Sequence, residues 1–312
     1  MTYPRKHNLI SKIAMNKAFY LLSFLIAFTA CDSSYEVTDL SEVAWIHGAE
    51  DCATNTDPLI QVVRYNENTW ILRQNKCSNY EAPFMFLFFG KEKALLMDTG
   101  ATEDEQQFPL YKTVMGIIDQ WNTENNTSVE LVVAHTHKHG DHYAADNQFI
   151  GKPRTTLVGL EVADLIDFFG LEDWPNTAGS FDLGERELKI IPIPGHQSSS
   201  IAVYDASTKL LLTGDTFYPG RLYVDDWPAF KISINRLVSF TEKNEVAFIL
   251  GNHIEMESTF GQDYPIGTVY QPDEMTLPLT TADLKELAKA NHKIGDKAIM
   301  EVHDKFIIYP TN

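Results

Sequence analysis

Four histidines and one aspartate lie within a single short segment, His135-Thr136-His137-Lys138-His139-Gly140-Asp141-His142. The run directly before it, Val129–Ala134, is largely apolar and typical of a buried strand. The cluster should therefore lie on the loop that leaves the carboxyl end of this strand, where open α/β sheets place their sites. Imidazole and carboxylate groups suit zinc, manganese or ferrous iron. The segment predicts a metal site.

The spacing within the segment divides the ligands into two sets. His137 and His139 are two residues apart, so an extended loop can point both rings toward one ion. Gly140 allows the backbone to turn, so that Asp141 and His142 can face a second ion beside the first. The alternative is a chance histidine-rich surface loop. We disfavour it because further ligand residues follow later strands.

Three later apolar runs also end in metal-ligand residue types. The run Leu188–Ile193 leads through Gly195 to His196, and Leu210–Gly214 leads directly to Asp215. The run Val246–Gly251 leads to His253. The alternative for each is a purely structural residue, but strands that end at one edge of a sheet would bring all three to the same place.

The motif His137-x-His139-x-Asp141-His142, with the later residues, resembles the signature of the metallo-β-lactamase-fold hydrolases, from about Pro58 to His253. The resemblance implies an α/β fold, an αββα sandwich of two mixed β-sheets flanked by helices. It also implies two zinc ions, with iron or manganese as alternatives. One ion would be held by His137, His139 and His196, the other by Asp141, His142 and His253, with Asp215 bridging both.

The resemblance implies a dinuclear metal-dependent hydrolase, in which a metal-bound hydroxide attacks an ester, lactone or thioester carbonyl of a small-molecule substrate. Asp141 would also orient the hydroxide. β-Lactamases of this fold generally carry cysteine or serine where Asp215 stands, so Asp215 favours the glyoxalase II-like and lactonase-like side of the family. Tyr218 resembles the tyrosine of the Asp-x-x-Tyr of acyl-homoserine-lactone lactonases, which contacts the substrate carbonyl or leaving oxygen; the alternative is a wall residue.

Other activities remain open at this point. One is β-lactam hydrolysis, and another is the chemistry of the persulfide dioxygenases, which share the ligand pattern but bind a single iron. A third is a non-catalytic protein with a vestigial site. We disfavour the last because a buried cluster of histidine and aspartate is costly without a metal.

The elements that would position these residues follow from periodicity and turn residues. We expect Asp98, which ends the strand 94–97, to orient a metal-binding histidine or to fix the loop rather than to act as a ligand. Apolar residues at helical spacing predict an amphipathic helix over 105–121. We also expect strand hairpins at 60–72 and 84–97, a helix at 161–169 ended by Gly170, and a helix capped by Thr280 and Asp283.

The first 31 residues are typical of a targeting segment. A basic start and the apolar run 18–30 precede Phe28-Thr29-Ala30-Cys31, which resembles the lipobox of bacterial lipoproteins. We expect export to the periplasm or cell envelope and a lipid anchor at Cys31; a simple cleaved signal or a short anchor helix is the alternative. Met15 is an alternative start. Residues 32–57 are expected to form a tether, and 58–312 the domain, with a C-terminal helical and lid-like extension.

Charge and cysteine content bear on partners and compartment. The formal net charge is −18, and removal of residues 1–30 brings it to about −22. Such a surface repels nucleic acid, which argues against the RNA-processing and DNA-repair nucleases that share the fold. Cys52 and Cys77 can form a disulfide in an oxidising compartment; two unpaired thiols are the alternative.

Overall fold

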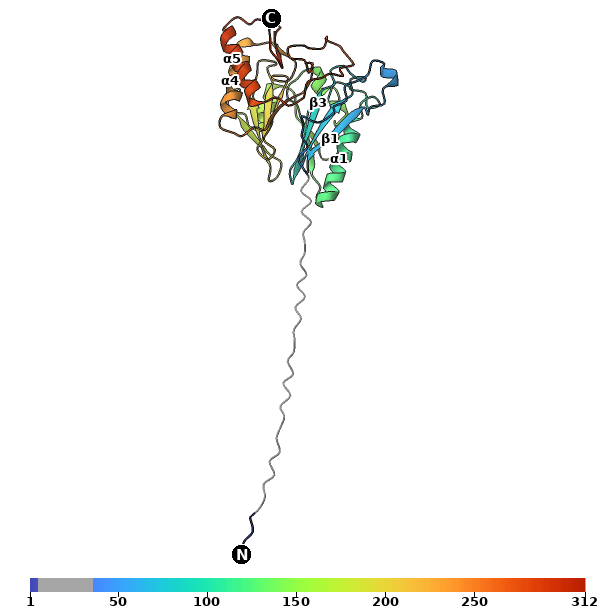
Figure 1. Ribbon diagram of the computed structural model, residues 1–312, viewed down its shortest axis with the longest axis vertical. Helices are drawn as coiled ribbons and strands as arrows, with labels where there is room; N and C mark the ends of the chain where they lie inside the picture. The colour runs from blue at the N-terminus through green and yellow to red at the C-terminus, as the bar shows by residue number, and fades with distance from the viewer. Residues whose placement is uncertain (5–35, 312) are drawn as a thin grey trace. The chain divides into compact units, whose positions relative to one another are not determined.

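The computed structural model describes residues 1–4 and 36–311. The greater part of the expected signal segment, including Cys31, lies outside the described residues. Two hairpins open the fold as predicted, β1 with β2 and β3 with β4. The main elements are β1 (Ile60–Asn66), β2 (Thr69–Gln74), β3 (Phe84–Phe89), β4 (Lys93–Met97), α1 (Leu110–Asn125), β5 (Glu130–Ala134), α2 (Gly140–Tyr143), β6 (Thr155–Leu157), α3 (Val162–Phe169), β7 (Gly179–Asp182), β8 (Glu187–Pro192), β9 (Ile201–Asp205), β10 (Leu210–Gly214), β11 (Arg221–Val224), α4 (Trp227–Thr241), β12 (Phe248–Gly251), α5 (Thr281–Ile294), β13 (Glu301–Val302) and β14 (Ile307–Pro310) (Figure 1).

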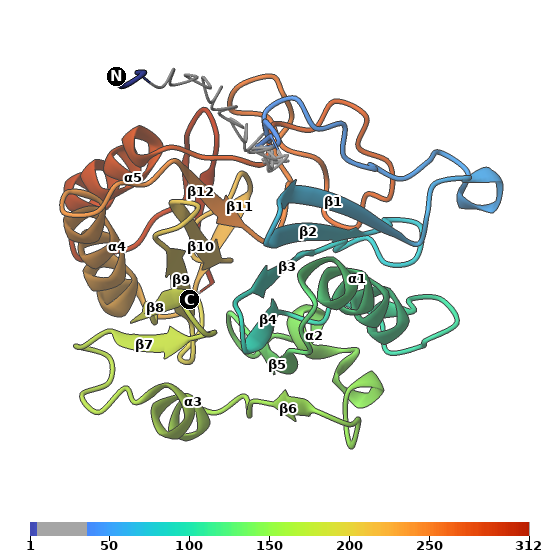
Figure 2. The ribbon, with the colours of Figure 1, turned by 90° about the horizontal axis from the view of Figure 1, so that it is seen from below.

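Two mixed sheets form the centre of the domain. One has six strands in the order β1-β2-β3-β4-β5-β6, and the other has five in the order β12-β10-β9-β8-β7. Figure 2 shows the two sheets side by side, with α1 outside the first and α4 and α5 outside the second. A smaller sheet, β11-β14-β13, accompanies them. This arrangement confirms the predicted α/β sandwich of mixed sheets flanked by helices.

Three apolar layers hold the sandwich together. The layer between the sheets joins residues such as Phe86 and Leu95 to Val203 and Leu212. A second layer packs α1 on the outer face of the six-stranded sheet, and a third packs α4 and α5 on the other sheet. The strands read as nearly continuous apolar runs because both faces of each sheet are covered.

The helices begin and end where local chemistry allows. The helix expected at 105–121 is α1 at Leu110–Asn125: it starts after Pro109 and ends where Asn126 is left-handed. The helix at 161–169 and its Gly170 end are confirmed, as is the Thr280–Asp283 capping box of α5. Helix α4 was not predicted, although Asp226 at the N-cap, with Pro228 two residues later, is a helix-start signal.

The expected tether at 32–57 is wrong for most of its length. Leu40, Trp45 and Ile46 are buried, and the first two belong to the layer between the sheets. The Thr38 amide donates to the Tyr65 carbonyl of β1. The tether was predicted from the many turn-forming residues of the segment, whereas these few apolar residues attach it to the domain. From about Thr38 onward, the segment is part of the packed unit.

A buried arginine connects the two sheets at one end of the sandwich. Arg186, just before β8, donates to the carbonyl of Asn68 in the β1–β2 turn and to the carbonyl of Phe89 at the end of β3. It also donates to Thr69 Oγ1 and forms an ion pair of 2.6 Å with Asp205 at the end of β9. Burial raises the pKa of Asp205, but Arg186 outweighs it and lowers that pKa below the usual value.

Replacement of Arg186 by methionine should destabilise the domain by roughly 3–5 kcal/mol, because Asp205 is left as an unpaired buried charge. Urea unfolding would measure the loss, with the exposed Arg154→Met as the matched control. The Asp205 pKa is depressed in the folded state, so this stabilisation exists above its unfolded pKa and is lost as pH falls through the folded value. A loss equal to that of the control would contradict the assigned bridge.

Cys52 and Cys77 form a disulfide, which decides between the two alternatives left open by the sequence. The bond joins the segment before β1 to the loop between β2 and β3, across a separation of 25 residues. The Asn75 side chain supports this loop by accepting from the Cys77 amide and donating to the Pro58 carbonyl. The β2–β3 loop is therefore held both covalently and by hydrogen bonds.

The double variant Cys52→Ser, Cys77→Ser should lower the free energy of unfolding by about 3–4 kcal/mol, the loop-closure entropy of a ring of this size. Thermal or urea unfolding of the oxidised wild type and the variant would measure the difference. Reduction of the wild type should give the same shift. An unchanged free energy of unfolding on reduction would show that opening this ring does not increase the entropy of the unfolded chain.

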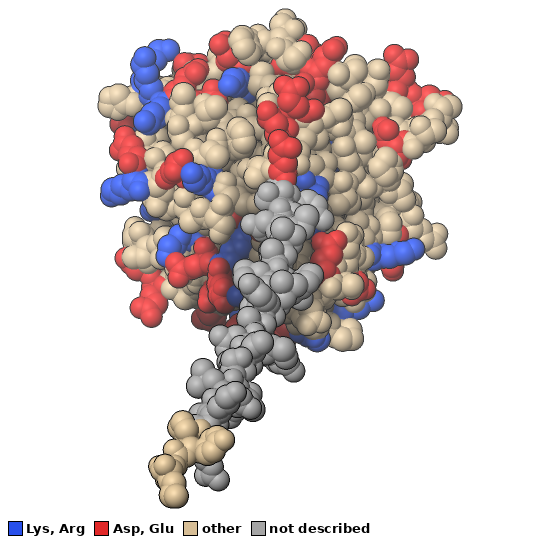
Figure 3. Space-filling view, turned by 60° about the horizontal axis from the view of Figure 1, so that its bottom comes forward, with Lys and Arg blue, Asp and Glu red and all other residues tan. Residues whose placement is uncertain are grey.

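The surface and the helices bear on the expected partners. Acidic and basic side chains are interspersed on the face seen in Figure 3. In the described part of the chain, no helix has the length and apolarity needed to cross a membrane.

Candidate metal centre

All seven predicted ligands come together at one edge of the sandwich. His137, His139, Asp141 and His142 follow β5, and His196, Asp215 and His253 follow β8, β10 and β12. β5 belongs to one sheet and the other three strands to the second. The carboxyl ends of β8, β10 and β12 share an edge because β10 is parallel to β12 and both β8 and β10 are antiparallel to β9.

The first group consists of His137, His139 and His196. His196 Nε2 lies 3.1 Å from His137 Nε2 and 3.1 Å from His139 Nδ1. Gly195 makes this approach possible: its φ is +143°, and a Cβ there would lie 2.4 Å from the Phe230 Cα of α4. Gly195 therefore permits the turn that brings His196 into the group.

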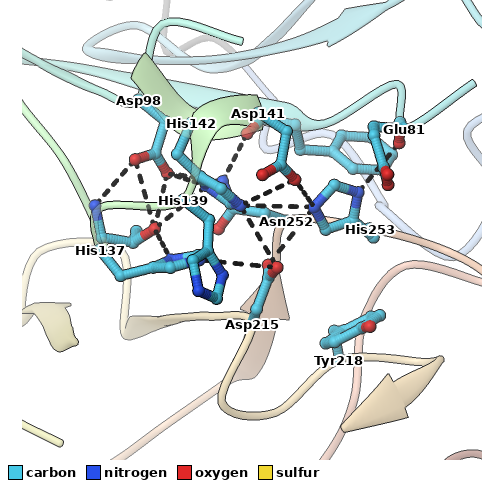
Figure 4. Close-up of polar contacts among 12 residues, drawn as sticks. Glu81, Asp98, His137, His139, Asp141, His142, Asp215, Tyr218, Asn252 and His253 are labelled. Carbon is cyan, nitrogen blue, oxygen red and sulfur yellow. Dashed lines mark hydrogen bonds and ion pairs between the residues drawn. The ribbon is translucent and has the colours of Figure 1, made fainter. Parts of the chain in front are cut away.

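The second group consists of Asp141, His142, Asp215 and His253, as Figure 4 shows. Asp141 Oδ2 lies 3.3 Å from both His142 Nε2 and His253 Nε2. The donor atoms of each group all lie within 4.8 Å of one another. A single ion could therefore contact every member of either group.

Asp215 lies between the two groups. Its Oδ2 is 3.3 Å from His142 Nε2 and 3.8 Å from His137 Nε2, and its Oδ1 is 3.4 Å from His253 Nε2. Oδ2 also lies 3.9 Å from His196 Nε2. One carboxylate thus faces ligand nitrogens of both groups. This is the arrangement that a bridging ligand requires.

Backbone carbonyls fix the orientation of two of the rings. His196 Nδ1 lies 2.7 Å from the Tyr223 carbonyl, and His253 Nδ1 lies 2.9 Å from the Glu81 carbonyl. A carbonyl only accepts, so both Nδ1 atoms donate and both Nε2 atoms face the centre. Sequence reasoning missed these two supports, since a carbonyl leaves no side-chain signal.

Asp98 binds the loops of both sheets beneath the ligands. Its Oδ1 accepts from the Thr136 amide at 2.8 Å, and its Oδ2 accepts from Asn252 Nδ2 at 2.6 Å. Asp98 Oδ2 is also 3.4 Å from His142 Nδ1. Asp98 therefore fixes the metal loop and lies in ion-pair range of a ligand histidine, the two roles that the sequence offered as alternatives. Asn252 was missed as a support although it directly precedes His253.

Burial and neighbouring charges separate the rings into two kinds. Burial lowers the pKa of His137 and of His196, so both rings stay neutral. Burial also lowers the pKa of His142 and His253, but carboxylates, Asp215 foremost, outweigh it and raise both values well above 6.5. His253 and His142 outweigh burial at Asp215 and hold its pKa well below the usual range.

The donor set fits divalent cations. The lone pair of His196 Nε2 faces two other ring nitrogens at 3.1 Å, a repulsive arrangement unless a cation lies among them. The second group combines two imidazoles with two carboxylates, a set suited to a divalent ion. The first group could hold one ion, and the second could hold another.

The centre opens into a cavity of about 270 Å³. Tyr218 lines it, with its ring centroid 5.7 Å from that of His253. Its hydroxyl is within hydrogen-bond distance of the Arg221 carbonyl and lies 3.0 Å from Glu255 Oε2, so it is already engaged. Burial and Glu255 raise the pKa of Tyr218 well above 10, so the phenol stays protonated. Tyr218 therefore forms part of the cavity wall.

Replacement of Asp98 by asparagine should weaken metal affinity about 10–100-fold, because a charged partner of His142 and an acceptor of the Thr136 amide are altered. Titration against a chromogenic chelator would measure the affinity. Asp119→Asn on the exposed face of α1 is the matched control. Equal affinities for the two variants would contradict the orienting role of Asp98.

Comparison with known proteins agrees with this geometry. The model of the "Metallo-beta-lactamase superfamily" matches residues 81–293. The human "Acyl-coenzyme A thioesterase MBLAC2" is 34% identical over 88 residues, which are 26% of this chain and 30% of that protein. The "Hydroxyacylglutathione hydrolase" of Brucella ovis is 25% identical over 161 residues, 47% of this chain and 62% of that protein. The chain thus spans less than two thirds of these relatives.

A solved structure gives the same fold. The metallo-β-lactamase from Erythrobacter litoralis has a TM-score of 0.50 and is 13% identical, with 77% of this chain and 99% of that chain covered. At this identity the likeness concerns the fold alone.

Proposed function

Since the chain belongs to the metallo-β-lactamase superfamily, we propose that it is a dinuclear metal-dependent hydrolase of esters, lactones or thioesters. The ions would be two zinc ions, with iron or manganese as alternatives. His137, His139 and His196 would hold one ion, and Asp141, His142 and His253 the other, with Asp215 bridging. The observation that carries the proposal is the position of Asp215 between ligand nitrogens of both groups.

Two divalent ions so held, when bound, would lower the pKa of a water molecule and polarise a carbonyl. The residues of the chain position the reactants around them. Asp141 is less buried than His142 and lines the cavity. We assign it to orient the attacking water by accepting a hydrogen bond from it.

Asp215 also guides the choice of substrate class. Because the bridging position holds a carboxylate rather than a cysteine or serine, the glyoxalase II-like and lactonase-like reaction is favoured over β-lactam hydrolysis. The partial similarity to a thioesterase and to a hydroxyacylglutathione hydrolase supports an ester-type or thioester-type bond.

Asp215→Ala should reduce hydrolysis by more than about 100-fold, beyond the loss typical of residues that only orient ligands. Proton release in a pH-stat would measure turnover by the zinc-loaded protein of a lactone, an aryl ester, a glutathione thioester and a β-lactam. Metal analysis should give two ions per wild-type chain and fewer in the variant. Efficient turnover of the β-lactam alone would contradict the proposed class. One iron with oxygen uptake on a persulfide would indicate a dioxygenase.

Tyr218→Phe should change kcat/KM by no more than about tenfold, the value of one neutral hydrogen bond. The reason is that its hydroxyl already contacts Glu255 and the Arg221 carbonyl. Steady-state kinetics on the preferred ester or lactone would measure the change. A much larger fall confined to kcat would instead support the direct contact with the substrate carbonyl that the Asp-x-x-Tyr motif suggests.

We also propose that the protein is exported to the periplasm or cell envelope and anchored by a lipid at Cys31, with a small molecule and not nucleic acid as its substrate. The Cys52–Cys77 disulfide supports an oxidising compartment. The formal net charge of −18 supports the exclusion of nucleic acid.

A further inference from the structure

A second cavity, also of about 270 Å³, adjoins the metal centre. It shares four lining residues with the first cavity, namely Glu81, Tyr223, His253 and Glu255. The two cavities therefore meet at His253, a member of the second ligand group. The segment 265–268 forms another part of its wall, and Lys76 and Gln271 line it as well.

Lys76 places an incompletely neutralised cation in this cavity. It is only 3% exposed, and its Nζ donates to the Tyr80 carbonyl at 3.1 Å. The carboxylate within 4 Å, among the described residues, is Glu274 at 3.9 Å. Both Glu274 oxygens are already bound by Arg73 at 2.6 and 2.7 Å. An ammonium carries three donors, so Lys76 keeps donors for a ligand.

The other cation of the cavity is neutralised. Arg221 Nη1 lies 3.1 Å from Glu255 Oε1, and its Nη2 lies 2.6 Å from Asp263 Oδ2. Two carboxylates thus balance one guanidinium. Of these two basic residues, Lys76 is the one whose nearest carboxylate, Glu274, is shared with Arg73; Glu81 and Glu255 of the same wall act on its charge from beyond 4 Å.

Gln271 adds an unsatisfied amide beside this charge. The residue is 5% exposed, and its Oε1 is buried without a hydrogen-bond partner in the described structure. Its backbone amide, by contrast, donates to the His47 carbonyl, which fixes the position of the residue. A buried amide left unpaired is costly. Rotation of the amide would place Nε2 where the unpaired Oε1 lies and would let it donate to an acceptor in the cavity.

We propose that Lys76 and Gln271 form a specificity site for a carboxylate that the substrate carries at a distance from the scissile carbonyl. The proposal rests on the hydrolase function proposed above and names a feature of its substrate. Lys76 would donate to the carboxylate, and Gln271 would reorient its amide to donate a second hydrogen bond. The Cys52–Cys77 disulfide, adjacent to Lys76 in sequence, holds this cation in place.

The ionisation of Lys76 supplies a signature of this role. Burial lowers its pKa to about 8, with Glu274, Glu255 and Glu81 raising it and Arg73 lowering it. The ammonium is present below that pH and is lost above it. Preference for a carboxylate should therefore decline as pH rises through about 8, whereas a merely structural lysine would leave substrate preference unchanged.

The first experiment compares kcat/KM for matched 4-nitrophenyl esters of hexanoic acid, adipic acid and adipamic acid. The adipate carries the remote carboxylate, the adipamate a neutral amide, and the hexanoate a methyl group. A second pair, 3-acetoxybenzoate and phenyl acetate, places the carboxylate on the leaving side. We expect the wild type to prefer the carboxylate over its neutral counterpart about tenfold or more in at least one series. Comparison of paired substrates cancels every pH effect common to both.

Lys76→Met should abolish this preference and leave turnover of the neutral esters largely unchanged, and Gln271→Leu should weaken it. Lys231→Met is the matched control, because this lysine pairs with Asp296 and does not line the cavity. Thermal unfolding would verify that the variants fold. Should Lys76→Met fail to fold, Gln271→Leu and the pH dependence of the wild-type preference decide the matter. No preference in either series, equal preference for the amide, or a preference that survives Lys76→Met would overturn the proposal.

Direct binding separates this proposal from the hydrolase function. The zinc-loaded protein is titrated calorimetrically with adipate and with hexanoate. Both ligands carry one carboxylate that can bind at the metal centre, and only adipate carries a second. Tighter binding of adipate that is lost in Lys76→Met would support the specificity site even if no ester in the panel were hydrolysed. Equal affinities would overturn the site even if hydrolysis were efficient.

Discussion

The buried carboxylate of Asp98 is the constraint on which the metal centre depends. It accepts hydrogen bonds from Thr136, which follows β5 in one sheet, and from Asn252, which follows β12 in the other. Its own backbone adopts a φ of +68°, a left-handed conformation that is unusual outside glycine. The hydrogen bonds to both loops compensate this local strain. The edge of the sandwich can therefore hold its ligands in register because one side chain ties both loops together.

The opposite end of the sandwich is held by different chemistry. There Arg186 donates to carbonyls of the first sheet and pairs with Asp205 of the second. Between the two polar connections lies a layer of buried apolar side chains from both sheets. Nondirectional packing excludes water and brings the sheets together, while the two buried polar networks fix their relative register.

The sequence predicted the parts of the site that depend on local pattern. Each of the seven ligands follows an apolar strand, and Asp98 ends one, so strand pattern and residue type indicated the candidates, and the resemblance to a known family assigned them to two ions. The hydrogen bonds that the Tyr223 and Glu81 carbonyls accept from the ligand rings could not be predicted, because every residue supplies a carbonyl. The pairing of Lys76 and Arg73 with Glu274 joins distant segments and leaves no local pattern. The prediction of a tether was wrong because the three buried apolar residues of this segment are surrounded in the sequence by many polar residues.

Each ligand group draws members from both sheets: His137 and His139 lie opposite His196, and Asp141 and His142 lie opposite Asp215 and His253. Any ion held in either group is consequently a cross-link between the halves of the sandwich. Its binding free energy adds to the cohesion of the interface at this edge, since the ligands are assembled only when the sheets are paired. Loss of metal should therefore allow one end of the sandwich to open locally. Amide hydrogen exchange would then be faster there than around Arg186. Metal bound at the proposed catalytic centre would thus also stabilise the fold.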